Sequence, residues 1–414
     1  MTLDASPIVA RRRSPLIGLL AADGISRAGN AITTIAVPLY VLSLTGSPLA
    51  TGFAGVFATV PIIIGGAMGG VLVDRFGWRR SSIVADAASG LTVLAIPVLA
   101  GLGMLPFPLL LALVFLSNLL DTPGSTARVA QMPDLVELAR TPLTRATGAH
   151  ATVSRTATML GAGVAGTLVA LFGPVNALYA NAVCFAIAIG LTLLLVPRDT
   201  PRVTSAIGDE LVPGRGYFGE LADGLRFVTR TPLVRAVVIL VVITNTIDSA
   251  GLTVLKPVYA AGLGDDGAVL GAMLACFAGG ALSGAALFSA IGHRIPRRPL
   301  FIIAFVLAGV PPYLTLALGA PLPVVFVVLV LSGFAAGPLN PLIDTALFGL
   351  IPSAMRARVF GAISTGVAAG MPLGSLLAGV GVEGLGLTVT LFLAAGLYAA
   401  AILSTSFGRR WHGF

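Results

Sequence analysis

Four aspartates lie inside long apolar runs of the sequence, where a charged side chain is costly to bury. They are Asp23, Asp121, Asp248 and Asp344. A charge at the centre of a membrane span costs about 2.5 kcal/mol or more, so such residues are commonly paired or functional. Burial favours a protonated carboxyl group, whereas an arginine beside it favours the charged form. Because an exchange of these two surroundings would take up and release a proton, all four are candidate proton-coupling residues.

Six further polar residues in the same runs are candidates for the wall of a substrate cavity: Arg27, Asn30, Asn118, Arg128, Asn245 and Asn340. Asp23 and Arg27 are four positions apart, so they share one helix face and can pair. Asp121 and Arg128, seven apart, also share a face. Two alternatives remain open. The first is that the pair of Asp23 and Arg27 is purely structural. The second is that the Arg128 side chain extends to the lipid headgroups on the cytoplasmic side.

Three more ionisable residues lie in neighbouring apolar runs: Asp86, His150 and Arg155. Arg155 lies deep in its apolar run, so we expect it to pair with a buried acid such as Asp86 or Asp121. His150, near the start of that run, is expected to be an interfacial histidine, with the role of a proton carrier as the alternative. Asp248 and Asp344 have no basic neighbour at helical spacing on their own runs, which favours either protonation or partners across a cavity.

The runs that carry these residues have the length and composition of membrane spans. The chain is 56% hydrophobic and 10% charged, with a mean hydropathy of +0.98, whereas soluble domains have roughly 25% charged residues. Each span needs about 20 apolar residues, and it must be helical to satisfy its backbone in lipid. The runs fall at residues 15–43, 49–73, 81–102, 107–132, 146–171, 174–197, 233–261, 267–291, 299–319, 322–350, 359–382 and 385–407.

Arginine placement predicts the orientation of these twelve helices. The alternate loops near 44–48, 103–106, 172–174, 262–266, 319–321 and 383–384 contain no arginine. The remaining loops and both termini contain many, and basic residues accumulate in cytoplasmic loops. Both termini are therefore predicted to be cytoplasmic, in a multi-pass protein of the cell (plasma or inner) membrane.

The one long polar stretch, residues 198–231, divides the runs six and six. Its first part reads as a flexible linker, and its second part, ending at Arg230, reads as an amphipathic helix on the inner membrane surface. Gly161 and Gly166 reappear as Gly374 and Gly379 at an offset of 213 positions. Duplicated helical units are typical of secondary transporters.

The sequence thus predicts an all-α membrane protein of twelve transmembrane helices in two six-helix bundles. The predicted domains are residues 1–197, 198–231 and 232–414. Helices 1, 4, 7 and 10 carry the polar residues singled out above, so these four helices are expected to line a central cavity.

Several function classes are disfavoured. The net charge of +8 is spread over short loops, which does not favour a nucleic-acid partner. Cys184 and Cys276 lie in apolar runs, as small buried residues do. No phosphate-binding glycine loop, metal cluster or nucleophile–base set is visible in the sequence, so neither a cofactor nor catalysis is expected.

The loop between helices 2 and 3 runs from Gly70 through Val71, Leu72, Val73, Asp74, Arg75, Phe76, Gly77, Trp78 and Arg79 to Arg80. It resembles the signature loop of the major facilitator superfamily. Two segments are similar to the drug-efflux branch of this superfamily, which includes macrolide exporters and the enterobactin exporter. One is Gly-Pro-Leu-Asn-Pro, which contains Asn340, and the other is Arg-Ala-Arg-Val-Phe-Gly, which contains Arg358. One departure is Gly161-Ala-Gly163, where drug exporters often have Gly-Pro.

The resemblance implies a cytoplasmic gate made of Gly70, Asp74, Arg75, Gly77, Arg79, Arg80 and Arg358. In it, Asp74 would face the positive N-terminus of helix 11. Arg75 and Arg79 would form charge pairs that hold the cytoplasmic side shut in the outward-facing state.

The function expected is proton-coupled export of a lipophilic or amphiphilic small molecule, such as a drug, an antibiotic or a siderophore-like compound, by alternating access. The partners expected are that substrate, protons and the lipid bilayer, with the protein a monomer. A slight excess of candidate acids favours cationic or neutral cargo. The alternatives are uptake by proton symport, and a transporter-shaped sensor or lipid-handling protein.

Overall fold

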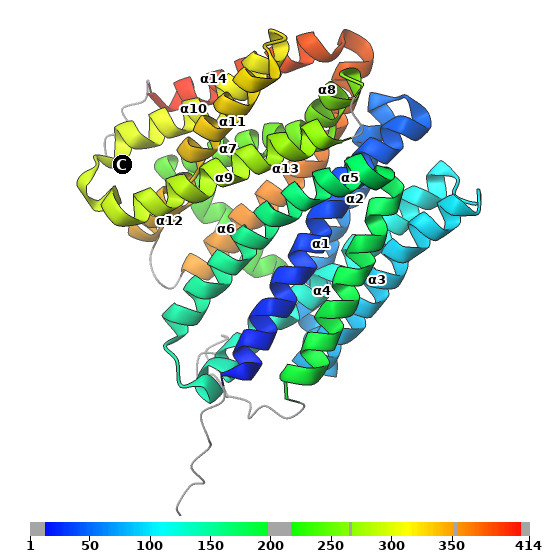
Figure 1. The fold of residues 1–414 in the computed structure, drawn as a ribbon. Helices are drawn as coiled ribbons and strands as arrows, with labels where there is room; N and C mark the ends of the chain where they lie inside the picture. Colours follow the sequence, from blue (N-terminus) through cyan, green and yellow to red (C-terminus); the bar gives the residue numbers. More distant parts are fainter. Residues whose placement is uncertain (1–12, 198–216, 265–266, 352–354, 407–414) are drawn as a thin grey trace, which may run out of the picture.

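The structure is a computed structural model that describes residues 13–197, 217–264, 267–351 and 355–406 (Figure 1). Over these ranges the chain is helical, and it contains no strand. The elements are α1 (Ser14–Thr45), α2 (Pro48–Phe76), α3 (Trp78–Gly101), α4 (Phe107–Ala139), α5 (Leu143–Leu195), α6 (Tyr217–Arg230), α7 (Pro232–Ala250), η1 (Gly251–Leu255), α8 (Lys256–Gly262), α9 (Ala268–Ile291), η2 (Gly292–Arg294), α10 (Arg297–Ala317), α11 (Leu322–Ala336), α12 (Leu339–Leu350), α13 (Arg356–Leu385) and α14 (Leu387–Ser406). The predicted all-α fold is confirmed.

Eleven described segments are long and apolar enough to cross a membrane. One of them, within α5, has 51 residues, more than twice the length that one crossing needs. Gly173 interrupts it with non-helical angles (φ 78°, ψ 162°), and Pro174 begins the next helix there. Counted as two spans, α5 brings the total to the twelve that the sequence predicts.

Two spans that read as continuous in the sequence are interrupted in the structure. A π-helical turn, η1, separates α7 from α8 within the span Pro232–Gly262. Gly337 and Pro338 separate α11 from α12. Proline lacks a backbone N–H and its ring collides with the preceding turn, which explains the second break.

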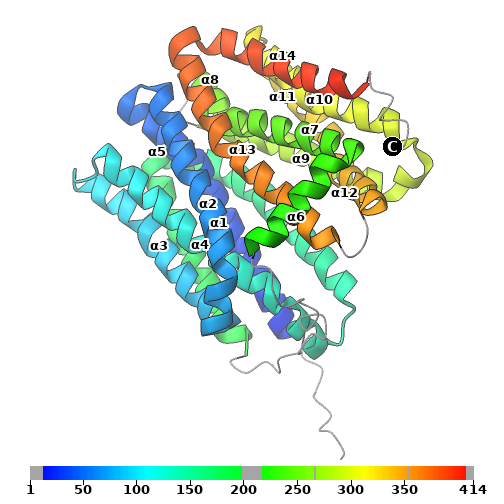
Figure 2. The same cartoon turned by 180° about the vertical axis from the view of Figure 1, so that it is seen from behind.

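Buried side chains divide the helices into two groups, which Figures 1 and 2 show as separate stacks. The largest hydrophobic cluster contains residues from Val228 to Ile402 only. A second cluster contains residues of the helices α1 through α5, together with two residues of the second half, Ala260 of α8 and Leu270 of α9. Helix α6 lies against α13 and α7. The exact domain boundaries stay a prediction, and 198–216 lies outside the described residues.

The glycines of the predicted repeat make equivalent contacts in the two halves. A Cβ atom on Gly161 of α5 would lie 2.6 Å from the carbonyl oxygen of Ala28 on α1. A Cβ atom on Gly374 of α13 would meet the carbonyl oxygen of Thr246 on α7. Small residues allow such close helix approach in lipid. The repeat seen in the sequence therefore corresponds to a repeat in packing.

A second pair of repeated glycines joins the halves to each other. Gly166 of α5 packs directly on the backbone of Gly271 in α9, and Gly379 of α13 packs on Gly52 in α2. Both contacts lie near helix ends that the arginine pattern places outside. From these ends the two stacks diverge (Figures 1 and 2). The halves therefore meet on the predicted outer side.

Candidate functional site

A buried cluster of charged side chains lies within the first half, and Arg128 of α4 is at its centre. The guanidinium donates from Nη1 to both carboxylate oxygens of Asp86 on α3, at 2.8 Å each. It donates from Nε to Oδ1 of Asp23 on α1 at 3.2 Å, and from Nη2 to Oγ of Ser26 at 3.3 Å. The Arg128 side chain is 2% exposed. Arg128 therefore ties three helices together.

Asp23 has two further partners on its other oxygen. Arg27 donates from Nε to Oδ2 at 2.7 Å, which confirms that this i,i+4 pair forms. The Nε2 atom of His150, on α5, lies 3.0 Å from the same oxygen. A carboxylate can only accept, so Nε2 carries the hydrogen of this contact when Asp23 is ionised.

Asp121 of α4 differs from the other acids in the cluster. Its Oδ2 atom accepts one hydrogen bond, 2.9 Å long, from Nδ2 of Asn30 on α1. Its Oδ1 atom is buried and has no hydrogen-bond partner among the described residues. Asp121 is thus a carboxyl group held by a neutral amide, without an ion pair.

The charges of the cluster do not balance. Its carboxyl groups are Asp23, Asp86 and Asp121, whereas its guanidinium groups are Arg27 and Arg128. If every acid is ionised and the histidine is neutral, one negative charge is in excess. An uncompensated buried charge is strongly unfavourable. One proton, on a carboxylate or on the imidazole, makes the cluster neutral.

The cluster corrects four expectations. Arg128 is buried among acids, so the alternative in which it reaches the headgroups is wrong. The partner of Asp86 is Arg128, whereas the side chain of Arg155 is exposed on α5. Asp121 bonds Asn30 instead of forming the ion pair that its spacing allows. The histidine is a member of the cluster and not an interfacial residue.

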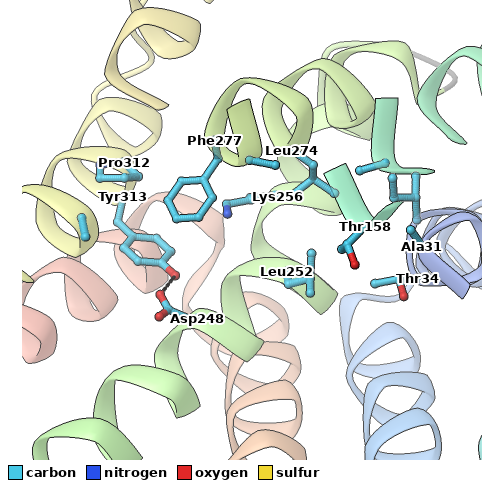
Figure 3. A pocket seen from close by; sticks show the side chains of 14 residues that line it. Ala31, Thr34, Thr158, Asp248, Leu252, Lys256, Leu274, Phe277, Pro312 and Tyr313 are labelled. Atoms are coloured by element: carbon cyan, nitrogen blue, oxygen red, sulfur yellow. Dashed lines mark hydrogen bonds between the residues drawn. The ribbon is translucent and has the colours of Figure 1, made fainter. Parts of the chain in front are cut away.

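A cavity of about 310 Å³ lies between the two halves (Figure 3). It is lined by residues of α1, α5, α7, η1, α8, α9 and α10, and most of them are apolar. The polar exceptions are three residues of the second half, Asp248, Lys256 and Tyr313, together with two threonines of the first half. Such a pocket, largely apolar with a few polar groups, is typical of small-molecule sites.

The three polar groups of the second half have few protein partners. The Tyr313 hydroxyl donates to the backbone oxygen of Ile247 at 3.0 Å and lies 3.5 Å from Oδ1 of Asp248. The Nζ atom of Lys256 lies 5.6 Å from the centroid of the Phe277 ring, within the range of a cation–π contact. Lys256 therefore lies on the cavity wall.

None of the six residues predicted for the cavity wall lines this cavity: Arg27, Asn30 and Arg128 belong to the buried cluster, and the other three have different surroundings. Asn118 and Asn245 donate to backbone oxygens one turn earlier, those of Val114 and Val241 respectively. Asn340 is exposed at the start of α12. Asparagine in a membrane helix can satisfy its own amide locally, which a sequence pattern does not reveal.

The predicted gate is only partly described. The structure does not describe the surroundings of four gate residues, Gly70, Asp74, Arg75 and Arg358. The same holds for Asp344, one of the candidate proton-coupling residues.

Three gate residues are described. Arg79 donates from Nε to the carbonyl oxygen of Val196 at 2.8 Å and from Nη2 to that of Leu193 at 2.9 Å, so it caps the end of α5. Gly77 adopts a φ of 80° before α3, and Arg80 is exposed.

Comparison with known proteins gives a match over nearly the whole chain. Residues 10–410 match a family described as transmembrane secretion effector. The chain is 30% identical over 390 residues to the multidrug efflux pump Tap of Mycolicibacterium fortuitum, covering 93% of each chain. It is 26% identical over 363 residues to the enterobactin exporter EntS of Escherichia coli O1:K1 / APEC, covering 86% of this chain and 81% of that protein.

Solved structures of the same fold include two transporters. The nucleoside transporter NupG superposes with a TM-score of 0.75 at 13% identity, covering 95% of this chain and 98% of the other. A D-xylose–proton symporter superposes with a TM-score of 0.73 at 16% identity, covering 96% and 99%. At this level of identity the likeness concerns the fold alone.

Proposed function

The chain belongs to the transmembrane secretion effector family of the major facilitator superfamily, and from this premise we propose that it exports a lipophilic or amphiphilic small molecule in exchange for protons. It is a multi-pass protein of the cell membrane, an efflux transporter and not an enzyme. The parts proposed here are the coupling to protons and the class of substrate.

The observation that carries the proposal is the charge imbalance of the buried cluster. Three carboxyl groups face two guanidinium groups, so the site is neutral when it holds one proton. Asp121 is our candidate for that proton, because Asp23 and Asp86 are each held by arginine whereas Asp121 has only the Asn30 amide. Losing the proton would leave a buried charge, which favours a change in the surroundings of the cluster.

The cluster is next to the path of the substrate. Arg27 and Asn30 lie within one turn of Ala31, which lines the cavity. A shift of α1 during transport would therefore act on both sites at once. Closing the inner ends while opening the contacts of Gly166 and Gly379 would expose the cavity to the outside, as alternating access requires.

The lining of the cavity supports the proposed class of substrate. Side chains such as Leu252, Leu274 and Phe277 offer an apolar surface, and few polar groups interrupt it. Burial of apolar surface contributes about 25 cal/mol per Å². The multidrug pump and the enterobactin exporter among the relatives are consistent with cargo of this kind.

The test has two stages. A panel of antibiotics in a host that lacks its own efflux pumps selects a compound to which the chain confers resistance. Everted membrane vesicles that contain the chain should then accumulate this compound when a proton gradient, acidic inside, is imposed. Uptake by symport predicts the opposite direction, and a sensor or lipid-handling protein predicts no accumulation.

Two variants separate coupling from folding. Asp121→Asn should abolish gradient-driven accumulation, because the amide cannot exchange a proton. Glu137→Gln is the matched control, since it removes an exposed carboxylate from the same helix and should accumulate like wild type. Full activity of Asp121→Asn would remove the role that we give to this residue.

A further inference from the structure

The π-helical turn η1 brings two opposite charges onto one wall of the cavity. Asp248 and Lys256 are eight positions apart, and residues at that spacing point about 80° apart on a continuous α-helix. A turn closed by i→i+5 bonds rotates less per residue and brings them back toward one line. Asp248, Leu252 and Lys256 all line the cavity (Figure 3). π-Turns of this kind are frequent at functional sites.

Asp248 and Lys256 attract each other electrostatically, but among the described residues neither charge lies in a close ion pair. No ion pair joins Lys256 to Asp248, or either of them to another residue, in the part of the chain that the structure describes. The ammonium group of Lys256 lies over the aromatic ring of Phe277. Asp23 and Asp86, in contrast, both form close ion pairs with Arg128.

The carboxylate of Asp248 is also open to a ligand. The Tyr313 hydroxyl has one proton, and its shorter contact is with the oxygen of Ile247, at 3.0 Å against 3.5 Å to Asp248. Asp248 therefore receives at most a weak hydrogen bond from Tyr313. Two opposite charges in an apolar cavity that attract each other without direct contact remain costly, and a ligand with the complementary charges relieves both.

We propose that the cavity binds an ampholytic amphiphile, a molecule with a cationic amine, an acidic group and an apolar body. The amine pairs with Asp248, the acid pairs with Lys256, and the body contacts Leu252, Leu274 and Phe277. A volume of about 310 Å³ is at the lower end of the range for small-molecule pockets. This inference rests on the proposed export function and replaces the sequence-based preference for cationic or neutral cargo.

Three dansyl compounds of nearly equal length test the proposal. Nε-dansyl-lysine carries an amine and a carboxylate, dansylcadaverine only the amine, and dansyl-6-aminohexanoic acid only the carboxylate. Each is titrated against the purified full-length protein in lipid nanodiscs, and binding is followed by the dansyl fluorescence, which rises in an apolar site. Wild type should bind the ampholyte about tenfold more tightly than either singly charged compound, the effect of one charge-assisted contact.

Two single-charge variants assign the contacts. Lys256→Gln should remove the preference for the ampholyte over dansylcadaverine and keep its preference over the acid. Asp248→Asn should do the reverse. Arg230→Gln, which neutralises an exposed charge on α6, is the control and should leave all three affinities unchanged.

A measurement on the wild-type protein avoids any effect of substitution on folding. Lys256 is the only lysine of the chain, so an amine-reactive reagent modifies this residue and the terminal amine alone. Dansyl-6-aminohexanoic acid has no free amine. It should slow modification of Lys256 several-fold and leave the terminal amine unaffected.

Equal affinities for the three compounds in wild type, or no measurable binding of the ampholyte, would overturn the proposal. So would an unchanged preference in Lys256→Gln. The titrations use no proton gradient, so they can fail while gradient-driven export succeeds, and they can succeed while export fails. The two claims are therefore tested separately.

Discussion

At the scale of single residues, the chain keeps its buried charges in two different ways. Arg128 has its charge neutralised by Asp86 and Asp23, and the flat guanidinium group can serve two acids at once. Asp248 and Lys256 have no such partners among the described residues. We interpret the cluster around Arg128, in which Asp121 is the acid without an ion pair, as the proton site, and the wall with Asp248 and Lys256 as the place where substrate binds.

Removal of Arg128 should destabilise the protein. Arg128→Met leaves Asp86 and Asp23 buried without their common partner, and breaking a buried ion pair typically costs about 3–5 kcal/mol. We expect a marked drop in the thermal unfolding temperature in detergent. Adding Asp86→Asn to this variant should recover part of the loss, because it removes one of the unpaired charges. Arg27→Gln, at a side chain 35% exposed, should cost much less.

The same scale limits what the sequence can predict. The pair of Asp23 and Arg27 follows from helical spacing and is confirmed. The partners of Arg128 are 42 and 105 positions away, so helical spacing carries no information about them. The expected pair of Arg155 and Asp86 fails for this reason. The sequence does indicate that a buried arginine requires acids on neighbouring helices, but it does not identify which acids.

At the scale of elements, hydropathy predicts where helices lie but not where they bend. Most helix ends lie within a few residues of the predicted ones, because the bilayer sets the length of an apolar run. The π-turn η1 and the break at Pro338 were not predicted. Both depend on local packing, to which an average over about 20 residues is insensitive.

Gly251 should be needed for the geometry of the π-turn. A Cβ atom at this position would collide with the Tyr313 hydroxyl and lie 3.1 Å from the ring atom Cε1. Overpacking of this kind costs about 1–3 kcal/mol. Gly251→Ala should therefore lower the unfolding temperature and weaken binding of the ampholyte. In a Tyr313→Phe background the same change should cost less, since the closest atom is gone. Equal losses in both backgrounds would contradict this account.

At the scale of the whole molecule, a carboxylate joins the halves at their predicted outer ends. Glu383 of α13 accepts hydrogen bonds from the hydroxyl of Ser47, at 3.2 Å, and from the backbone N–H of Leu49, at 3.4 Å. The second contact places a negative charge at the N-terminus of α2, where the helix dipole is favourable. Separation of these ends on outward opening would break the contact.

Glu383→Ala should therefore shift the protein toward an outward-open state. A contact of this kind is worth about 0.3–1 kcal/mol, which changes the ratio of the two states roughly two- to fivefold. Spin labels at Leu44→Cys and Leu385→Cys, in a background without Cys184 and Cys276, report the distance between α1 and α13 by pulsed electron resonance. More long distances are expected in the variant, whereas an unchanged distribution would show that the contact does not hold the ends together.

The central claim concerns the whole molecule, since a proton in one half is exchanged for a substrate between the halves. It is tested most directly in proteoliposomes that contain a trapped pH indicator. When the compound selected by the antibiotic panel moves down its gradient, wild type should move protons in the opposite direction. Asp121→Asn should still move the compound but no protons, because transport down a gradient needs no coupling. Proton movement that persists in Asp121→Asn, or that is absent from wild type, would contradict the account.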